Sequence, residues 1–280
     1  MSAFSENAYI PFQVPKKRRR RGQELSLKPD GETLLRDELA AGGFELVKLI
    51  NTNDVQAYLA VRSDLAVLAF RGTATFTDWC TDLNVGLKRL IEDGDFGIHK
   101  GFWHAYASAG DEILQAVNAH VPATLPLYIT GHSLGGALAQ IASAVLERDN
   151  LAACYTFGSP RVATRDFDRE VKCPHYRVIN NWDLVPGVPP TIVGYRHTGD
   201  PRLLSPKAEG REALRRDQSD LARIWAYFKL TTLAPILRRV AIIDDHMIWN
   251  YRRQLDEIAA SRNPEGQERR AWFEANEEAG

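Results

Sequence analysis

The sequence has few cysteines, no long apolar run and almost no net charge, and each shortage argues against a class of protein. Three cysteines in 280 residues are too few, and odd in number, for a disulfide framework, and no CxxC pair suggests a metal site. A reducing compartment fits this usage. No uninterrupted apolar run reaches the roughly 18 residues of a membrane-spanning helix. The 35 basic and 36 acidic side chains nearly cancel, so the overall charge gives no reason to expect a nucleic-acid partner.

The two ends of the chain differ in composition from its middle. Residues 1–30 contain the basic run Lys16–Arg21, which cannot bury apolar area, so we expect a flexible basic tail there. Residues 263–280 are expected to form a polar C-terminal tail. Residues 1–14 lack the continuous apolar segment of a secretory signal. We therefore expect a cytoplasmic protein, or one exported without a cleavable signal peptide, with at most peripheral contact to a membrane.

The spacing of apolar residues predicts one α/β domain over residues 31–262. Four short apolar or β-rich runs are typical of buried strands: 65–70, 127–130, 153–157 and 176–179. A first helix and two further strand candidates precede them: 34–39, 44–50 and 57–61. Apolar side chains at helical spacing mark later helices: 106–117, 134–145 and 248–258. Strands that alternate with helices predict a mostly parallel central sheet flanked by helices.

Residues 131–135 read Gly-His-Ser-Leu-Gly and fit the G-x-S-x-G pattern of a nucleophile elbow. The pattern lies between a predicted strand and an Ala-rich helix, a setting in which a serine is lifted above the edge of a sheet. Small residues allow this strand and helix to approach closely: Gly131, Gly135 and Gly136. Because a helix N-terminus offers free N–H groups, the amide of Leu134 can stabilise an oxyanion. We therefore predict that Ser133 is a nucleophile.

A nucleophilic serine needs an imidazole to accept its proton and a carboxylate to orient that imidazole. In folds with such an elbow, the acid and the histidine follow the serine along the chain. Three histidines lie beyond the predicted elbow helix: His175, His197 and His246. His175 precedes its strand and so lies at the wrong edge of the sheet. His246, in a loop before the last helix, is the preferred base, and His197 stays an alternative.

Asp183 is the preferred acid because it follows the strand 176–179 and emerges at the C-terminal edge, where ligands bind in open α/β sheets. Asp166 and Asp168 lie in a charged, helix-like stretch and suit the role less well. A helix cap or a solvated loop acid is the alternative interpretation of Asp183. For His132, which precedes the serine, we expect a side chain that points elsewhere and a structural role.

Several separated motifs agree in order and spacing with one protein family. They read Phe-Arg-Gly-Thr at 70–73, Thr-Asp-Trp-Cys-Thr-Asp-Leu at 77–83, His-Lys-Gly-Phe at 99–102, Gly-His-Ser-Leu-Gly-Gly at 131–136, Phe-Gly-Ser-Pro-Arg-Val at 157–162, Asp-Leu-Val-Pro at 183–186 and Asp-His at 245–246. With these motifs, the stretch from about 58 to 255 resembles the class 3 lipases, the group that contains the filamentous-fungus triacylglycerol lipases. The resemblance implies an α/β-hydrolase fold, with no metal in the chemistry and no organic cofactor.

The resemblance also assigns roles to individual residues. It implies a catalytic triad of Ser133, Asp183 and His246. His197 then matches a non-catalytic position. Thr73 is expected to contribute to the oxyanion hole together with the amide of Leu134.

Phe76, Trp79 and Leu83 recur at spacings of three and four, which gives a short helix one apolar face. An ordinary helix packed on the core would show the same spacing. The resemblance favours a lid that covers an acyl groove, so we expect these three residues to contact the lid or the substrate.

Residues 214–243 depart from the family's pattern, and residues 200–243 are expected to form a basic amphipathic insertion. Between 214 and 243 an apolar stripe is accompanied by basic residues: Leu221, Ile224, Trp225 and Phe228 with Arg215, Arg216, Arg223, Lys229, Arg238 and Arg239. This pattern resembles an interfacial helix, although a core or oligomer-contact helix is an alternative. We expect peripheral contact with an anionic membrane through 214–243 and Lys16–Arg21.

Together these features predict a serine lipase that cleaves the acyl esters of a triacylglycerol, phospholipid or other glycerolipid through an acyl-enzyme. Two alternatives stay open. One is a carboxylesterase or thioesterase that acts on short, soluble acyl groups. The other is a catalytically silent lipid-binding protein, which the predicted base and orienter argue against because binding alone needs neither.

Overall fold

The computed structural model describes residues 1–10, 31–52, 54–72, 87–89, 96–180, 183–204, 214–215 and 246–262. Its α-helices are α1 (Ser2–Asn7), α2 (Gly31–Ala41), α4 (Lys100–Ala107), α5 (Gly110–His120), α6 (Leu134–Val145) and α9 (Ile248–Arg262). Its short 3-10 helices are η1 (Arg165–Arg169), η2 (Val185–Gly187) and η3 (Thr191–Val193). Its strands are β1 (Glu45–Asn51), β2 (Gln56–Val61), β3 (Ala66–Phe70), β4 (Leu87–Arg89), β5 (Gly97–His99), β6 (Leu127–His132), β7 (Leu151–Phe157), β8 (Ala163–Thr164), β9 (His175–Asn180), β10 (Tyr195–Arg196), β11 (Asp200–Leu204) and β12 (Leu214–Arg215).

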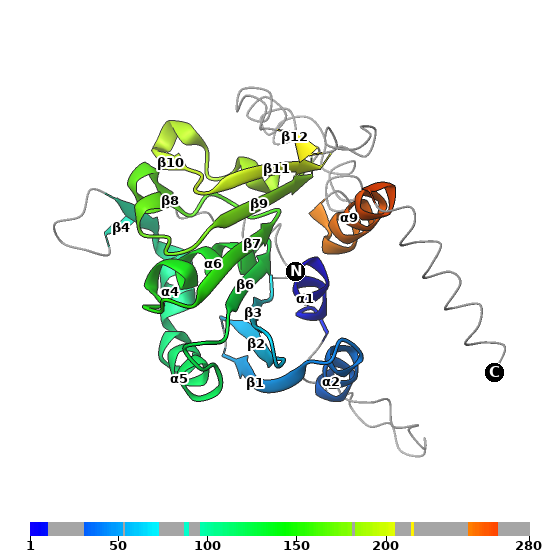
Figure 1. The fold of residues 1–280 in the computed structure, drawn as a ribbon. Coiled ribbons are helices and arrows are strands. Elements are labelled where there is room, and N and C mark those ends of the chain that lie inside the picture. Colours follow the sequence, from blue (N-terminus) through cyan, green and yellow to red (C-terminus); the bar gives the residue numbers. More distant parts are fainter. Residues whose placement is uncertain are drawn as a thin grey trace, which may run out of the picture.

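The central sheet has the strand order β1-β2-β3-β6-β7-β9-β11-β12. Strands β3, β6, β7, β9 and β11 run parallel, while β1 and β2 at one edge and β12 at the other pair antiparallel to their neighbours. Helices α4, α5 and α6 lie on one side of this sheet, and α1, α2 and α9 lie on the other (Figure 1). The predicted α/β class, with a mostly parallel sheet flanked by helices, is confirmed. A smaller sheet has the order β10-β8-β5-β4.

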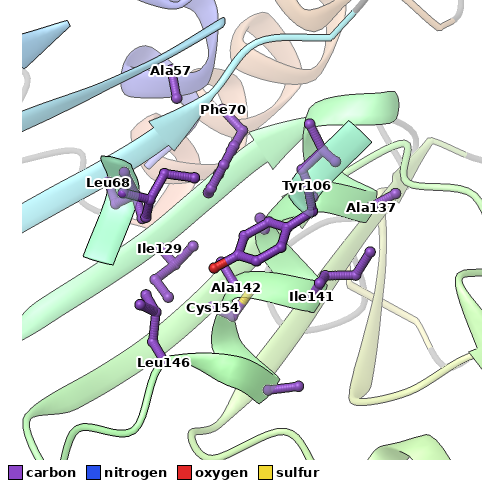
Figure 2. Packing of buried hydrophobic residues seen from close by; sticks show 14 of the residues in the cluster. Ala57, Leu68, Phe70, Tyr106, Ile129, Ala137, Ile141, Ala142, Leu146 and Cys154 are labelled. Carbon is purple, nitrogen blue, oxygen red and sulfur yellow. The ribbon is translucent and has the colours of Figure 1, made fainter. Parts of the chain in front are cut away.

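Successive side chains of a strand point to opposite sides of the sheet. Both faces are buried because helices cover each side. In β3, Leu68 and Phe70 belong to the cluster that packs against α4, α5 and α6, whereas Val67 and Ala69 belong to the cluster with α2. Figure 2 shows the first cluster, in which the ring of Tyr106 lies among side chains of the strands and of α6. A strand covered on both faces reads as a continuous apolar run, which explains why the sequence revealed it.

The four strongest strand predictions are confirmed, as are the helices at 34–39, 134–145 and 248–258. The single helix predicted over 106–117 is wrong, because the chain breaks at Ser108–Ala109 and forms α4 and α5. Leu114, which the spacing assigned to the apolar face, is 42% exposed. The other four positions of that face, Tyr106, Ala109, Ile113 and Val117, are buried, so the spacing located the buried side but not the break between the helices.

The first ten residues are not a flexible tail, so the expectation for residues 1–30 is wrong in this part. Helix α1 packs against β6 and α9 (Figure 1), and Ser5 and Ala8 are fully buried. The Ser5 hydroxyl hydrogen-bonds to the Thr130 hydroxyl at 2.9 Å, and Arg252 forms a 2.8 Å ion pair with Glu6. Small side chains let this helix approach the sheet closely. Because they bury little apolar area, the apolar content of the sequence does not indicate this contact.

The proposed insertion at 200–243 begins too early. Residues 200–204 form β11, which pairs in parallel with β9 inside the central sheet, and 214–215 form β12 beside it. The rest of the basic amphipathic segment, the run Lys16–Arg21 and residues 263–280 lie outside the described residues. Within the described part of the chain, no helix is both long enough and apolar enough to cross a membrane.

A buried histidine at the start of β9 connects this strand to β7 and to the loop before β11. His175 hydrogen-bonds through Nε2 to the Thr156 hydroxyl and through Nδ1 to the Thr198 hydroxyl, both at 3.0 Å. Burial, with a smaller contribution from the nearby Arg177 guanidinium, lowers the pKa of His175 to about 3. The folded protein therefore holds this imidazole in its neutral form at neutral pH.

We predict that His175 makes stability fall with acidity. The unfolded chain takes up this proton near pH 6.5 and the folded chain only near pH 3. Stability from this group is thus full above about pH 6.5 and is lost as the pH falls toward 3. Urea denaturation of His175→Gln between pH 7 and 4 should show a shallower pH dependence than wild type. His120→Gln, at an exposed histidine, is the control, and an unchanged slope in His175→Gln would contradict the assignment.

Candidate active site

Ser133 lies at a sharp turn between the end of β6 and the start of α6. Its backbone has φ 58° and ψ −128°, and among the described residues it is the only non-glycine with positive φ. Such a conformation costs about 1–3 kcal/mol and persists only where the surroundings enforce it. The Ser133 amide donates to the Phe157 carbonyl at 3.0 Å, which ties the turn to the end of β7. This geometry fits a nucleophile elbow.

The glycines around Ser133 are required by close backbone contacts. A Cβ on Gly131 would collide with the Gly135 carbonyl, and one on Gly135 would collide with the Phe70 carbonyl. A Cβ on Gly136 would lie 2.7 Å from Cβ of Ser159. Strands β3 and β6 can therefore approach helix α6 at the Ser133 turn only because these positions carry no side chain.

The Ser133 side chain is enclosed, with 1% of the residue exposed. Its hydroxyl has no hydrogen-bond partner among the described residues. Leu134, the first residue of α6, directs its backbone amide from a helix N-terminus, where N–H groups have no partner within the helix. The hydroxyl is thus buried beside a positive helix end, which favours negative charge developing at that point.

Asp183 and His246, 63 residues apart in the chain, form a buried pair. Nδ1 of His246 lies 2.9 Å from Oδ2 of Asp183, and the two residues are 4% and 0% exposed. The carboxylate also accepts hydrogen bonds from the Tyr251 hydroxyl at 2.5 Å and from the Val185 amide at 2.9 Å. Since the carboxylate accepts at Nδ1, that nitrogen carries the proton and leaves Nε2 as the basic nitrogen.

Gly158 brings this pair to the elbow. It follows Phe157, whose carbonyl binds the Ser133 amide, and it has φ 55°. A Cβ on Gly158 would meet Oδ2 of Asp183 at 2.5 Å and Cε1 of His246 at 3.1 Å. The Gly158 backbone therefore lies between the Ser133 turn and the Asp183–His246 pair. Ser133, Asp183 and His246 lie at the same edge of the sheet.

His132, expected to be structural, also contacts the candidate base. Its ring centroid lies 4.5 Å from that of His246, and its Nε2 lies 2.5 Å from the His246 carbonyl oxygen. Burial, and then the nearby His246, lower the pKa of His132 well below its ordinary value. This neutral imidazole holds the backbone of the loop that carries the base.

The acid loop is held by residues that the sequence did not single out for this task. The buried Arg161 guanidinium donates through Nη1 to the carbonyls of Gly187 at 2.6 Å and Pro189 at 3.0 Å. Nε2 of His197, the alternative base, lies 2.7 Å from the Pro186 carbonyl oxygen. His197 therefore supports the loop after Asp183. The motif at 157–162 included Arg161, but only the fold shows what it binds.

The other acids considered lie away from this pair. Asp168 is exposed and accepts a hydrogen bond from the Gly199 amide, and Asp166 pairs with Arg169 at 3.7 Å. The expected oxyanion residue Thr73 and the expected lid residues Phe76, Trp79 and Leu83 lie outside the described residues. In the part of the chain that is described, no cluster of His, Cys, Asp or Glu could hold a metal ion.

Two residues of the site were missed by the sequence reasoning. Tyr251 lies in the helix predicted over 248–258 and was given no role in the site, yet its hydroxyl donates to Asp183 and accepts a hydrogen bond from the Asn180 amide at 3.0 Å. Gly158 belonged to a quoted motif without a stated role. A tyrosine five positions after the candidate histidine was the available signal for the first, but spacing alone does not identify its partner.

The chain is similar to known lipases. Residues 67–193 match the family model described as lipase (class 3). Secreted mono- and diacylglycerol lipase 1 of Fusarium solani is 38% identical over 138 residues, which cover 47% of this chain and 41% of that protein. The lipase of Rhizomucor miehei is 31% identical over 145 residues, which cover 48% of this chain and 40% of that protein. The chain thus spans about two fifths of the length of these curated relatives.

A likeness to solved structures agrees with the architecture. Lipase II from Rhizopus niveus superposes with a TM-score of 0.59 at 22% identity, over 75% of this chain and 83% of that chain. At this identity the likeness shows the fold alone. The mixed, mostly parallel sheet flanked by helices is therefore shared with a lipase structure.

We predict that the Tyr251 hydroxyl supports the acid. Tyr251→Phe removes a donor to the buried carboxylate and leaves the Asn180 amide without this acceptor, so the free energy of unfolding should fall by about 1–3 kcal/mol. Labelling of Ser133 by a fluorophosphonate should slow as well, because the base loses orientation. Tyr106→Phe, which alters a buried tyrosine on α4, is the control. Equal slowing in both variants would contradict a specific role for Tyr251.

Proposed function

We propose that the chain is a class 3 lipase, as its match to that family model over residues 67–193 supports, and that it hydrolyses acyl esters of lipids through an acyl-enzyme on Ser133. The observation that carries this proposal is the buried 2.9 Å contact between His246 and Asp183 at the same edge as the strained serine. A binding protein needs neither an oriented base nor a serine held at positive φ. The family match adds the substrate class, an ester with a lipid acyl group.

In the proposed reaction, Ser133 attacks the carbonyl carbon of the ester while its hydroxyl proton moves to Nε2 of His246. The tetrahedral intermediate collapses when His246 gives this proton to the departing alkoxide, which leaves as an alcohol. Water then attacks the acyl-enzyme with His246 again as base, and the fatty acid leaves from Ser133. Asp183 keeps the proton on Nδ1 and stabilises the imidazolium formed in each half of the reaction.

The negative charge of the intermediate needs donors that are aimed before the reaction starts. The amide of Leu134 at the N-terminus of α6 is one proposed donor, and Thr73 is the other, by resemblance to the family. Gly72, directly before Thr73, packs against the elbow, since a Cβ there would lie 3.1 Å from Cβ of Ser133. The segment that leads to Thr73 thus starts beside the nucleophile.

Partial acylglycerols are the first substrates to test, because a relative that is 38% identical is a mono- and diacylglycerol lipase. Phospholipids and triacylglycerols are the next classes. A lid over residues 76–83 and peripheral contact with an anionic membrane through 214–243 and Lys16–Arg21 also belong to this proposal. The lid and the membrane contact both predict that activity depends on a lipid surface.

Ser133→Ala should lower turnover of a diacylglycerol emulsion by about 10³- to 10⁶-fold, because the residual rate comes only from binding and oxyanion stabilisation. The measurement is fatty-acid release by the purified protein. Ser143→Ala is the matched control, since Ser143 is a buried serine on the same helix whose hydroxyl donates to the Gln140 carbonyl. Retained activity in Ser133→Ala would refute the proposed nucleophile.

A series of acyl esters of increasing chain length, each assayed below and above its solubility limit, tests the lipid assignment. We expect the rate to rise when an emulsion or vesicle surface forms, because a lid and a membrane-binding surface act there. A soluble carboxylesterase or thioesterase would prefer short chains and ignore the interface. A silent lipid-binding protein would bind the long-chain esters without turnover and would leave Ser133 unlabelled by a fluorophosphonate.

A further inference from the structure

The N-terminal segment reaches the candidate active site through Tyr9. The Tyr9 hydroxyl lies 2.7 Å from Nδ1 of His132, 123 positions later in the chain. The backbone of Gly72 also packs against this hydroxyl, because a Cβ at this position would collide with it. One side chain from the first ten residues therefore touches the residue before the nucleophile and the residue before Thr73.

The directions of these hydrogen bonds follow from the chemistry of the groups. The His246 carbonyl oxygen can only accept, so Nε2 of His132, 2.5 Å away, must carry the proton. The low pKa of His132 keeps the ring neutral, which leaves Nδ1 as an acceptor. The Tyr9 hydroxyl, whose own pKa is raised by burial, then donates to Nδ1. The hydrogen bonds run from the Tyr9 hydroxyl through His132 to the His246 carbonyl.

We propose that Tyr9 is a positioning residue that acts through His132 to fix the backbone of His246 and, by packing against Gly72, the start of the oxyanion segment. This inference rests on the proposed role of His246 as the base. The two halves of the site, the base loop and the oxyanion segment, are far apart in sequence. Tyr9 gives them one common support.

The surroundings of Gly72 show that this support fits without spare room. A Cβ on Gly72 would collide with the Tyr9 hydroxyl, and it would lie 2.7 Å from the His132 carbonyl oxygen. The Arg71 guanidinium lies over the Tyr9 ring at 5.6 Å. The tyrosine is thus enclosed by the same backbone that leads to the oxyanion segment. The Tyr9 hydroxyl can reach His132 because residue 72 is a glycine and has no side chain.

The helix before Tyr9 is fixed by contacts outside the site. The Tyr58 hydroxyl donates to the Phe4 carbonyl at 2.7 Å, and Ser5 bonds to Thr130. These contacts hold α1 in place whether or not Tyr9 has a hydroxyl group. The helix position and the Tyr9 relay can therefore be altered separately by mutation.

The relay matters because general-base catalysis depends on the position of the imidazole. A displacement of about 1 Å can cost about 10²-fold in rate. The carboxylate of Asp183 fixes the ring of His246 at Nδ1, while His132 fixes its backbone carbonyl. Loss of the Tyr9 hydroxyl leaves the second restraint weaker, so turnover should suffer while substrate binding should not.

The test compares Tyr9→Phe with Tyr58→Phe in the full chain, with diacylglycerol emulsion as substrate. Each variant removes one tyrosine hydroxyl that holds the N-terminal segment, but only Tyr9 contacts His132. We expect Tyr9→Phe to lower kcat about tenfold with KM changed less than about twofold, and Tyr58→Phe to keep the wild-type kcat. Wild-type kcat in Tyr9→Phe, or an equal loss in both variants, would overturn the proposal.

Nuclear magnetic resonance of the protein labelled with ¹⁵N-histidine tests the relay without an activity assay. Tyr9→Phe should shift the Nδ1 signal of His132 and the backbone amide signal of His246, and Tyr58→Phe should change neither. An unchanged His246 amide in Tyr9→Phe would overturn the coupling. If wild-type protein hydrolyses no ester but these shifts appear, the proposed function fails while the relay itself stands.

Discussion

The hydrogen bond between the buried carboxylate of Asp183 and Nδ1 of His246 is the contact on which the rest of the site depends. A fully buried carboxylate is unfavourable unless donors surround it. The Tyr251 hydroxyl and the Val185 amide supply two of them, and the missing side chain of Gly158 leaves space for the pair. Arg161 and His197 hold the following loop by its carbonyls. The acid and the base are thus oriented before any substrate binds.

The elbow places a second demand on the same sheet edge. Ser133 keeps a strained backbone only because β6, β7 and α6 fix it from several sides, and these elements approach closely through positions without side chains. The apolar core beneath the sheet makes this arrangement rigid, since close-packed interiors resist displacement. Stability of the core and precision of the site therefore have one physical origin.

Local patterns were sufficient for much of this. The buried strands read as apolar runs, the elbow followed from five consecutive residues, and Asp183 was placed at the correct edge because it follows a parallel strand. The sequence-based predictions were wrong where contacting residues are far apart in the chain or have small side chains. Residues 1–10 were included in a tail because of the basic run Lys16–Arg21 that follows them, although Ser5 and Ala8 are fully buried. β11 was assigned to an insertion because its five residues, Asp-Pro-Arg-Leu-Leu, show no strand alternation.

The sequence by itself determined the fold class, the elbow and the set of candidate acids and histidines, because each depends on neighbouring residues or on spacing along one element. The family resemblance already grouped Asp183 with His246. Tertiary structure alone decided which other groups meet: Asp183 with Tyr251, His197 with the Pro186 carbonyl, and Tyr9 with His132. These partners come from different elements. Their proximity is set by the packing of helices on both faces of the sheet, which no local pattern encodes.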